Sequence, residues 1–285
     1  MATLDLLFIF MCLIFNKNKK INLRKGRVEM ERYKENRDFL KANFQVLDEI
    51  KTDAQKKISK PSVQKHYEKN NKIIKLPKVN RDILSKSNVF DCIGHRRSIR
   101  QYSNESITIE ELSFLLWSTQ GVQKIIGDNT STLRTVPSGG ASHTFETYLI
   151  IKNVDNLEAG IYRYLPLEHK LLFMYEVKDI NKKVDEATPR QPFVPNFASK
   201  SAVLFAWSTI PYRAEWKFDI TAHKKILIDV GHVCQNLYIA CEAVQCGTCA
   251  IGIYDQELID NMLNLDGENE FVIYLSAVGK SDNTI

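Results

Sequence analysis

In the second half of the chain, one stretch with the apolar periodicity of a helix interrupts a series of short β-rich runs. Between Val230 and Val244 the apolar residues recur three or four positions apart, which indicates an amphipathic helix over residues 229–244. The buried face of such a helix needs a hydrophobic surface to cover, and strands on either side of it in the sequence can supply one. The runs expected to form strands are Thr147–Ile151, Gly160–Leu165, Leu171–Val177, Ala202–Ile210 and Phe271–Val278.

Two further helices are expected before these strands. Thr108 and Glu111 have the spacing of a capping box, in which each side chain hydrogen-bonds to the backbone N–H of the other residue. They open a helix that ends at Gly121, and a shorter helix is predicted over Val89–His95. Strands and helices interleave without the regular alternation of a doubly wound parallel sheet, which predicts an α+β fold.

The first third of the chain differs in composition from the rest. Residues 30–78 are charged and helix-prone, without Gly or Pro before Pro61, and predict a helical N-terminal extension and linker that packs on a partner or on the core. The globular domain is expected over residues 79–285. Residues 1–29 form a doubtful leader, because its apolar run precedes its basic run, the reverse of a secretory signal, and is too short to span a membrane. A mis-called start before Met30 and a peripheral anchor are the two alternatives, and a cytoplasmic protein is expected.

The segment His95–Tyr102, HRRSIRQY, concentrates three arginines around one serine. Alternation along an extended chain places Arg96, Ser98 and Arg100 on one side. Two guanidinium groups beside a hydroxyl suit a phosphate monoester, although a solvated basic face is an alternative that these residues alone leave open. The 39 basic and 34 acidic residues are too nearly balanced to favour a nucleic-acid-binding domain.

Two other motifs lie further along the chain. The Pro137–Gly140 turn, PSGG, removes side chains where a backbone approaches a flat or bulky group. Cys246 and Cys249 have the spacing of a redox motif or of half a zinc site, but no second pair of zinc ligands stands at a suitable interval. We therefore predict no metal site and interpret these cysteines as small buried residues in a tight turn.

Taken in order over residues 60–280, these motifs resemble the nitroreductase superfamily, specifically its SagB-type (thiazole/oxazole dehydrogenase-like) branch. The resemblance implies an α+β fold with a nitroreductase-like mixed β-sheet flanked by helices, an intertwined homodimer, and non-covalently bound FMN at each subunit interface. The stretches that carry it are HRRSIRQY, ELSFLLWSTQGV, LRTVPSGGASHTFETYLI, GIYRYLPLEHKL, DVGHVCQNLYIA, GTCAIGIYD and FVIYLSAVGK.

The resemblance also implies roles for individual residues. The arginine segment would hold the FMN phosphate, the PSGG turn would face the isoalloxazine ring from the other subunit, and the chain after the long helix would follow the far edge of the ring. A terminal lysine would add a phosphate or ribityl contact. In this sequence these are Arg96, Arg97, Ser98 and Arg100, then Pro137, Ser138, Gly139 and Gly140, then Ala250, Ile251 and Gly252, and last Lys280.

The implied activity is that of an FMN-dependent oxidoreductase that transfers hydride between NAD(P)H, FMN and an unidentified small oxidant. NAD(P)H would be a transient reductant, since no G-x-G-x-x-G motif follows a predicted strand. The branch's azoline dehydrogenases use a Lys-Tyr pair before the long helix, where this chain has Lys217 and Phe218. Lys217 is the candidate catalytic residue, but a phenyl ring cannot move a proton.

That departure favours a stand-alone reductase. The alternatives are an azoline dehydrogenase and a non-catalytic flavin-binding subunit of a peptide-modifying complex. His143, His223 and His232 are interpreted as structural histidines. The expected partners are a second copy of the chain and a small-molecule substrate, with no nucleic acid, and no membrane unless the leader is real.

Overall fold

The computed structural model of the protein describes residues 33–42, 44–68, 70–127, 130–191 and 194–281. The chain divides by its contacts into residues 1–42 and residues 43–285. In the first unit, the described residues contain one short helix, α2 (Lys34–Phe39). The leader expected over residues 1–29 lies outside the described residues.

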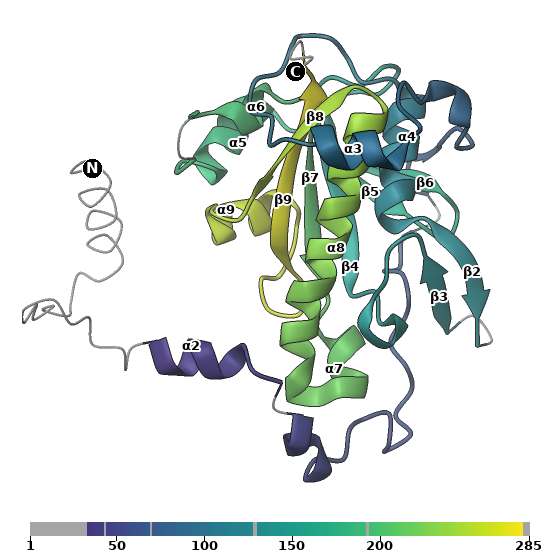
Figure 1. Ribbon diagram of the computed structural model, residues 1–285, viewed down its shortest axis with the longest axis vertical. Coiled ribbons are helices and arrows are strands. Elements are labelled where there is room, and N and C mark those ends of the chain that lie inside the picture. The colour runs from purple at the N-terminus through teal and green to yellow at the C-terminus, as the bar shows by residue number, and fades with distance from the viewer. Residues whose placement is uncertain (1–32, 43, 69, 128–129, 192–193, 282–285) are drawn as a thin grey trace, which may run out of the picture. The chain divides into compact units, whose positions relative to one another are not determined.

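The second unit is built around one large sheet (Figure 1). In the described residues, seven strands follow the order β1-β6-β5-β4-β7-β9-β8, and all six neighbouring pairs are antiparallel. The expectation of a mixed sheet is therefore wrong for these pairs, and parallel pairing is confined to isolated bridges such as Ser98–Thr248. The strands are β1 (Ile73–Lys75), β4 (Phe145–Ile151), β5 (Gly160–Leu165), β6 (Lys170–Tyr175), β7 (Val203–Thr209), β8 (Cys246–Ile251) and β9 (Phe271–Lys280), and β2 (Val122–Ile126) pairs with β3 (Ser131–Arg134) in a separate hairpin.

The sheet has a hydrophobic core on each face. Along β4, Leu149 and Ile151 belong to one core and Tyr148 and Ile150 to the other, because successive side chains point to opposite faces. Every residue of β4, β5 and β7 is buried. Two of these strands accordingly carry continuous apolar runs, Tyr148–Ile151 in β4 and Val203–Trp207 in β7.

Helices cover both faces of the sheet. The long helix α8 runs along the first face together with α4, as Figure 1 shows for α8. Shorter helices contribute to the core on the second face. Among the described helices, none has both the length and the apolar character needed to cross a bilayer. The helices are α3 (Val89–His95), α4 (Ile109–Gln120), α5 (Ile180–Ala187), α6 (Phe197–Lys200), α7 (Tyr212–Phe218), α8 (Ala222–Ala243) and α9 (Gln256–Met262).

The structure confirms the predicted elements and shifts some of their ends. The capping box of Thr108 and Glu111 is formed, and the five expected strands are present. The amphipathic helix begins at Ala222, seven residues earlier than residue 229, and its first turn carries the polar residues 223–225 ahead of the apolar pattern. Cys246–Cys249 was expected to be a turn but forms the start of strand β8, where both thiols are buried.

Residues 52–68, which we call the strap, are tied to the sheet domain by buried polar groups. The Glu146 carboxylate accepts from the backbone N–H of Lys65 at 2.8 Å, and the Arg163 guanidinium donates to the carbonyl of Lys65 at 3.1 Å. Arg134 donates to the carbonyl of Val63 at 3.0 Å. Within the described part of the extension predicted as helical, the helical segments are α2 and the 3₁₀ turn Phe44–Asp48, whereas the strap itself packs on the core.

Candidate functional site

The arginine segment follows α3 and lies along the edge of the sheet formed by β8. The backbone N–H of Ile99 donates to the carbonyl of Thr248 at 3.0 Å. Gly247 makes this approach possible, since a Cβ there would be 2.6 Å from the Ile99 side chain. The segment is therefore held by its backbone and by Ile99, and its polar side chains are left for other contacts.

Tyr238 of α8 joins several of these side chains at one place. The Arg96 guanidinium lies over the Tyr238 ring, 5.3 Å from its centroid. The Tyr238 hydroxyl is 3.1 Å from the Ser98 hydroxyl and accepts a hydrogen bond of 2.9 Å from the backbone N–H of Ala250. Arg100 donates to the carbonyl of Ser98 at 3.5 Å. We call Arg96, Ser98, Arg100, Tyr238 and Ala250 the arginine end.

Arg97 makes different contacts from this group. Its guanidinium donates to the carbonyls of Gly94 at 3.2 Å and of Arg96 at 2.8 Å, at the C-terminal end of α3. Within the described residues, no carboxylate forms an ion pair with Arg96, Arg97 or Arg100. Three positive charges thus lie close together without a protein counter-ion.

The PSGG turn lies against α8 at a different level. The Asp229 carboxylate accepts from the Ser138 hydroxyl at 2.7 Å and from the backbone N–H of Gly139 at 3.0 Å. Burial raises the pKa of Asp229, although these hydrogen bonds lower it in part. Gly140 has a φ of +63°, and a Cβ there would be 2.6 Å from Cζ of Phe218. The turn therefore requires glycine at this position for both its conformation and its contact with α7.

Two lysines flank the same turn. The ammonium groups of Lys217 and Lys225 lie 5.5 and 4.5 Å from the centroid of the Phe218 ring, within the range of cation–π contacts. The Lys217 ammonium is 3.1 Å from the position that a Cβ of Gly140 would occupy. The candidate catalytic residue is thus next to the turn predicted to face the flavin ring. We call Pro137–Gly140, Lys217, Phe218, Lys225 and Asp229 the glycine-turn end.

The two ends are separated along α8. Asp229 and Tyr238 are nine residues apart, which corresponds to about 14 Å at the usual rise of an α-helix. A single chain therefore brings the predicted residues together as two groups, and the arginine end and the glycine-turn end do not form one site by themselves.

Two residues that were predicted to bind the cofactor lie outside both ends. The Lys280 ammonium forms an ion pair of 2.5 Å with Glu111, the capping residue of α4. Burial opposes the charge of Lys280, but the hydrogen bond and the charge of Glu111 prevail and raise its pKa. Ile251 is buried in the second core, so only its backbone can face a ligand, whereas Gly252 is exposed. Lys280 thus has a structural role at the start of α4.

The remaining candidates behave as structural groups. Burial, followed by the charge of Arg134, lowers the pKa of His143 to about 3. His223 pairs with Glu215 at 2.8 Å. Burial also raises the pKa of Cys249 and that of Cys246, the latter to about 12, so both are neutral thiols at pH 7. The described residues contain no cluster of metal-binding side chains.

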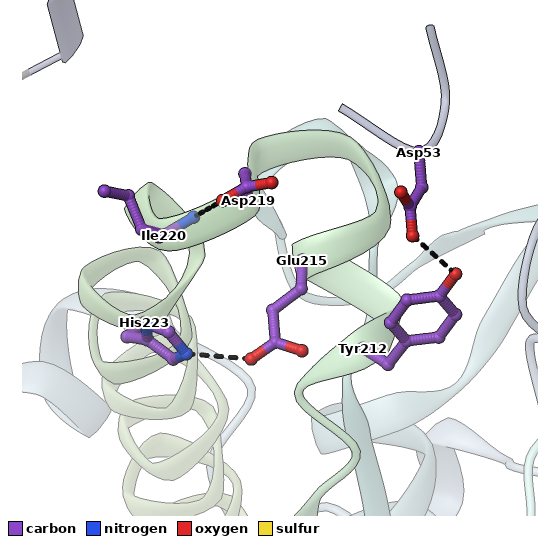
Figure 2. Close-up of a pocket in the computed structure, with 6 residues that line it drawn as sticks. All are labelled: Asp53, Tyr212, Glu215, Asp219, Ile220 and His223. Atoms are coloured by element: carbon purple, nitrogen blue, oxygen red, sulfur yellow. Dashed lines mark hydrogen bonds and ion pairs between the residues drawn. The ribbon is translucent and has the colours of Figure 1, made fainter. Parts of the chain in front are cut away.

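A surface hollow of about 230 Å³ lies beside α7 and the start of α8 (Figure 2). Two hydrogen-bonded pairs line it, Asp53 with Tyr212 and Glu215 with His223. Asp219 adds a third carboxylate. This lining would repel a phosphate, and the hollow contains none of the predicted cofactor-binding residues.

Sequence reasoning did not identify Tyr238, Asp229 or Lys225 as site residues. Asp229 had a signal, since a carboxylate in an otherwise apolar stretch of a helix needs a partner. Tyr238 lies at the margin of the helix's buried face, and its role depends on which segments the fold places against it. The role of Lys225 likewise depends on how the PSGG turn packs on α8.

Comparison with known proteins gives a consistent result. The sequence model of the nitroreductase family matches residues 93–280. A protein of Methanocaldococcus jannaschii that carries the name of a nitroreductase is 27% identical over 190 residues, which are 67% of this chain and 89% of that protein. The trifolitoxin-processing protein TfxB of Rhizobium leguminosarum bv. trifolii is 25% identical over 155 residues, which are 53% of this chain and 40% of TfxB.

Among solved structures, a nitroreductase-type protein of Ralstonia eutropha superimposes with a TM-score of 0.59 at 20% identity. The superposition covers 79% of this chain and 95% of that protein. It supports the assignment of the fold.

Proposed function

Because the chain belongs to the nitroreductase family, we propose that it is an FMN-dependent oxidoreductase of the SagB-type branch that oxidises NAD(P)H and reduces a small oxidant. The observation that carries the cofactor assignment is the arginine end, whose two guanidinium groups, with that of the neighbouring Arg97, form no ion pair with a carboxylate among the described residues. A phosphate would supply the missing negative charge.

The donors at the arginine end fit a phosphate monoester. Arg96 and Arg100 offer forked N–H donors, and the Ser98 hydroxyl lies between them in the sequence. Charge-assisted hydrogen bonds of this kind contribute roughly 1.5–3 kcal/mol each. Arg97 would add to the potential through its charge, since one of its guanidinium nitrogens already donates to the carbonyls of Gly94 and Arg96.

The glycine-turn end fits a flat aromatic group. Gly139 and Gly140 present backbone without side chains. Asp229 of α8 holds the turn in place through its hydrogen bonds with Ser138 and Gly139. When bound, FMN supplies a hydride acceptor at N5 of its ring. Lys217 and Lys225 would stabilise negative charge that develops beside the turn. Phe218 provides packing and has no proton to transfer.

A homodimer would bring the two ends together. Lys225 and Tyr238 each lie six residues from the pair Gly231–His232, on opposite sides. If two α8 helices cross antiparallel at this pair, Lys225 of one subunit is level with Tyr238 of the other. At Gly231 an added Cβ would meet nothing within 4 Å, and the neighbouring Leu227 and Ile228 are about half exposed.

The surface around this crossing supports the same arrangement. On α3, Phe90 is 80% exposed and Ile93 is 56% exposed. Large exposed apolar side chains mark a surface that another protein covers, and α3 packs on α8. We infer that these side chains are covered by the second subunit, which completes the cofactor site.

The direct test is to purify the full chain and to measure its flavin and its turnover. We expect a yellow dimer that releases FMN on denaturation and consumes NAD(P)H with a quinone or a nitroaromatic compound. Mass spectrometry identifies the released cofactor. A colourless protein that takes up no added FMN would contradict the proposal.

Peptide modification is the second candidate function, because TfxB is by its name a trifolitoxin-processing protein. The match covers 40% of TfxB, so a shared activity is an inference for this chain. An azoline dehydrogenase would need Lys217 to move the proton without help from Phe218. A mixture of a thiazoline peptide and the protein, followed by mass spectrometry for the loss of two hydrogen atoms, distinguishes this candidate from a stand-alone reductase.

A further inference from the structure

Three lysines converge beside the PSGG turn from separate parts of the chain. Lys60 belongs to the strap, Lys217 to α7 and Lys225 to α8. The strap reaches this place by running along α7, where the Ala54 N–H donates to the carbonyl of Trp216 at 2.8 Å and the Trp216 indole donates to the carbonyl of Ile58 at 2.9 Å.

The contacts of these lysines leave their charges without a counter-ion. The Lys60 ammonium donates to the Ser131 hydroxyl, and the Lys225 ammonium donates to the carbonyl and the hydroxyl of Thr221, both at 3.3 Å. Lys217 contacts the Phe218 ring. Over the described ranges of the chain, none of the three forms an ion pair with a carboxylate.

The carboxylate that attracts Lys225 is already engaged in other contacts. Asp229 attracts Lys225, but its oxygens accept from Ser138 and Gly139 and hold the turn in place. Burial lowers the pKa of Lys60, and the charge of Lys217 lowers it further. Burial also lowers the pKa of Lys225. Like charges that act on one another in this way cost free energy in the protein alone, and an anion would recover it.

We propose that Lys60, Lys217 and Lys225 form an anion-binding site beside the PSGG turn, which takes the phosphate or carboxylate group of a molecule that reacts there. The inference rests on the proposed function, since it assumes that a redox partner approaches the turn. It makes the strap, which lies before the residues matched by the family, a determinant of specificity. The shared chemistry is an anionic group, which has two sources: the 2′-phosphate of NADPH and the carboxylate of an acidic oxidant.

The test measures two selectivity ratios in the holoenzyme. The first is kcat/KM for NADPH over NADH, and the second is kcat/KM for 4-nitrobenzoate over the neutral 4-nitrobenzamide. The variants are Lys60→Gln, Lys217→Gln and Lys225→Gln, and glutamine at position 60 keeps a donor for Ser131. Lys51→Gln is the matched control, because Lys51 is an exposed lysine just before the strap.

We expect Lys60→Gln to lower one of the two ratios about tenfold, which corresponds to the loss of one charge-assisted contact. A fall in the NADPH ratio identifies a phosphate, and a fall in the nitrobenzoate ratio identifies a carboxylate. The control should leave both ratios unchanged. Unchanged ratios in all three lysine variants, with normal flavin content, would overturn the anion site.

A binding measurement separates this inference from the proposed function. Adenosine 2′,5′-bisphosphate, adenosine 5′-monophosphate and 4-nitrobenzoate are titrated calorimetrically into wild type and Lys60→Gln. If the protein holds no FMN, the proposed function fails, while binding of the bisphosphate or of the nitrobenzoate that weakens about tenfold in Lys60→Gln still supports the anion site. Equal affinities in wild type and variant for all three probes would overturn it.

Discussion

The Asp229 carboxylate accepts a hydrogen bond of 2.7 Å from the Ser138 hydroxyl, and through this bond α8 fixes the position of the PSGG turn. Asp229→Ala leaves this hydroxyl and the Gly139 N–H without their acceptor. We expect a loss of about 1–3 kcal/mol in the free energy of unfolding. Urea denaturation measures it, with Asp229→Asn as the control that keeps one acceptor oxygen. A loss of the same size in both variants would show that the hydrogen bonds are not the cause.

The cofactor assignment depends on Arg96 and Arg100. Replacing both by alanine should weaken FMN binding about 100-fold or more, since each charge-assisted contact contributes roughly 1.5–3 kcal/mol. Fluorescence titration of the apoprotein gives the affinity, and circular dichroism checks the fold. Arg81→Ala, at an exposed arginine before α3, is the control. Unaltered affinity in the double variant would refute the phosphate assignment.

His143 gives a prediction for pH. Its pKa is about 3 in the fold and 6.5 in the unfolded chain, so the unfolded chain binds the additional proton between these values. Stability due to His143 is therefore present above pH 6.5 and is lost as the pH falls, by about 1.4 kcal/mol per pH unit. His143→Asn suits the positive φ of 43° and removes this dependence. Urea denaturation of both proteins at pH 5 and pH 7 measures the difference. Equal pH slopes would count against a neutral buried His143.

Gly231 tests the proposed subunit contact. A tryptophan at this position would keep two α8 helices from approaching, so Gly231→Trp should be monomeric and should lose FMN. Sedimentation velocity reports the mass, and absorbance reports the flavin. Glu257→Trp, on the exposed side of α9, places the same side chain away from the contact. A dimeric, yellow Gly231→Trp protein would place the interface elsewhere.

Phe218 tests the branch assignment. Wild type should form only traces of thiazole from a thiazoline peptide, because removal of the ring proton needs a base within about 3 Å or one bridging water. In Phe218→Tyr the new hydroxyl stands on Cζ, the ring atom nearest to Gly140, and close to Lys217. Thiazole formation should then rise, whereas Phe218→Leu should stay inactive. Rapid oxidation by the wild type would show that Lys217 acts alone.

The sequence predicted the features that depend on local patterns. The capping box, the five strands and the side of the chain shared by Arg96 and Ser98 all follow from spacing, and the structure confirms them. Cys246–Cys249 was misread because its glycine was taken for a turn residue. Gly247 is instead the position in β8 where the Ile99 side chain crosses, and this contact is made by a residue far away in the sequence.

Other features depend on tertiary packing and left no local signal. Lys280 was expected at the cofactor, but the fold places Glu111 beside it and the two charges pair. Tyr238 joins Arg96, Ser98 and Ala250 only because α8, β8 and the arginine segment meet there. The extended strap replaced a predicted helix, since its backbone groups are satisfied by buried charges of the sheet domain.

The strap has a consequence for modularity. Three charged side chains of the sheet domain form hydrogen bonds with the strap backbone, and each is at most 6% exposed: Glu146, Arg134 and Arg163. A fragment that begins near Val79 would leave these buried ionic groups without their strap partners, and we expect it to be less stable than the full chain. A chimeric protein that takes this domain therefore has to include residues 52–68 as well, because they supply the partners of its buried charged groups.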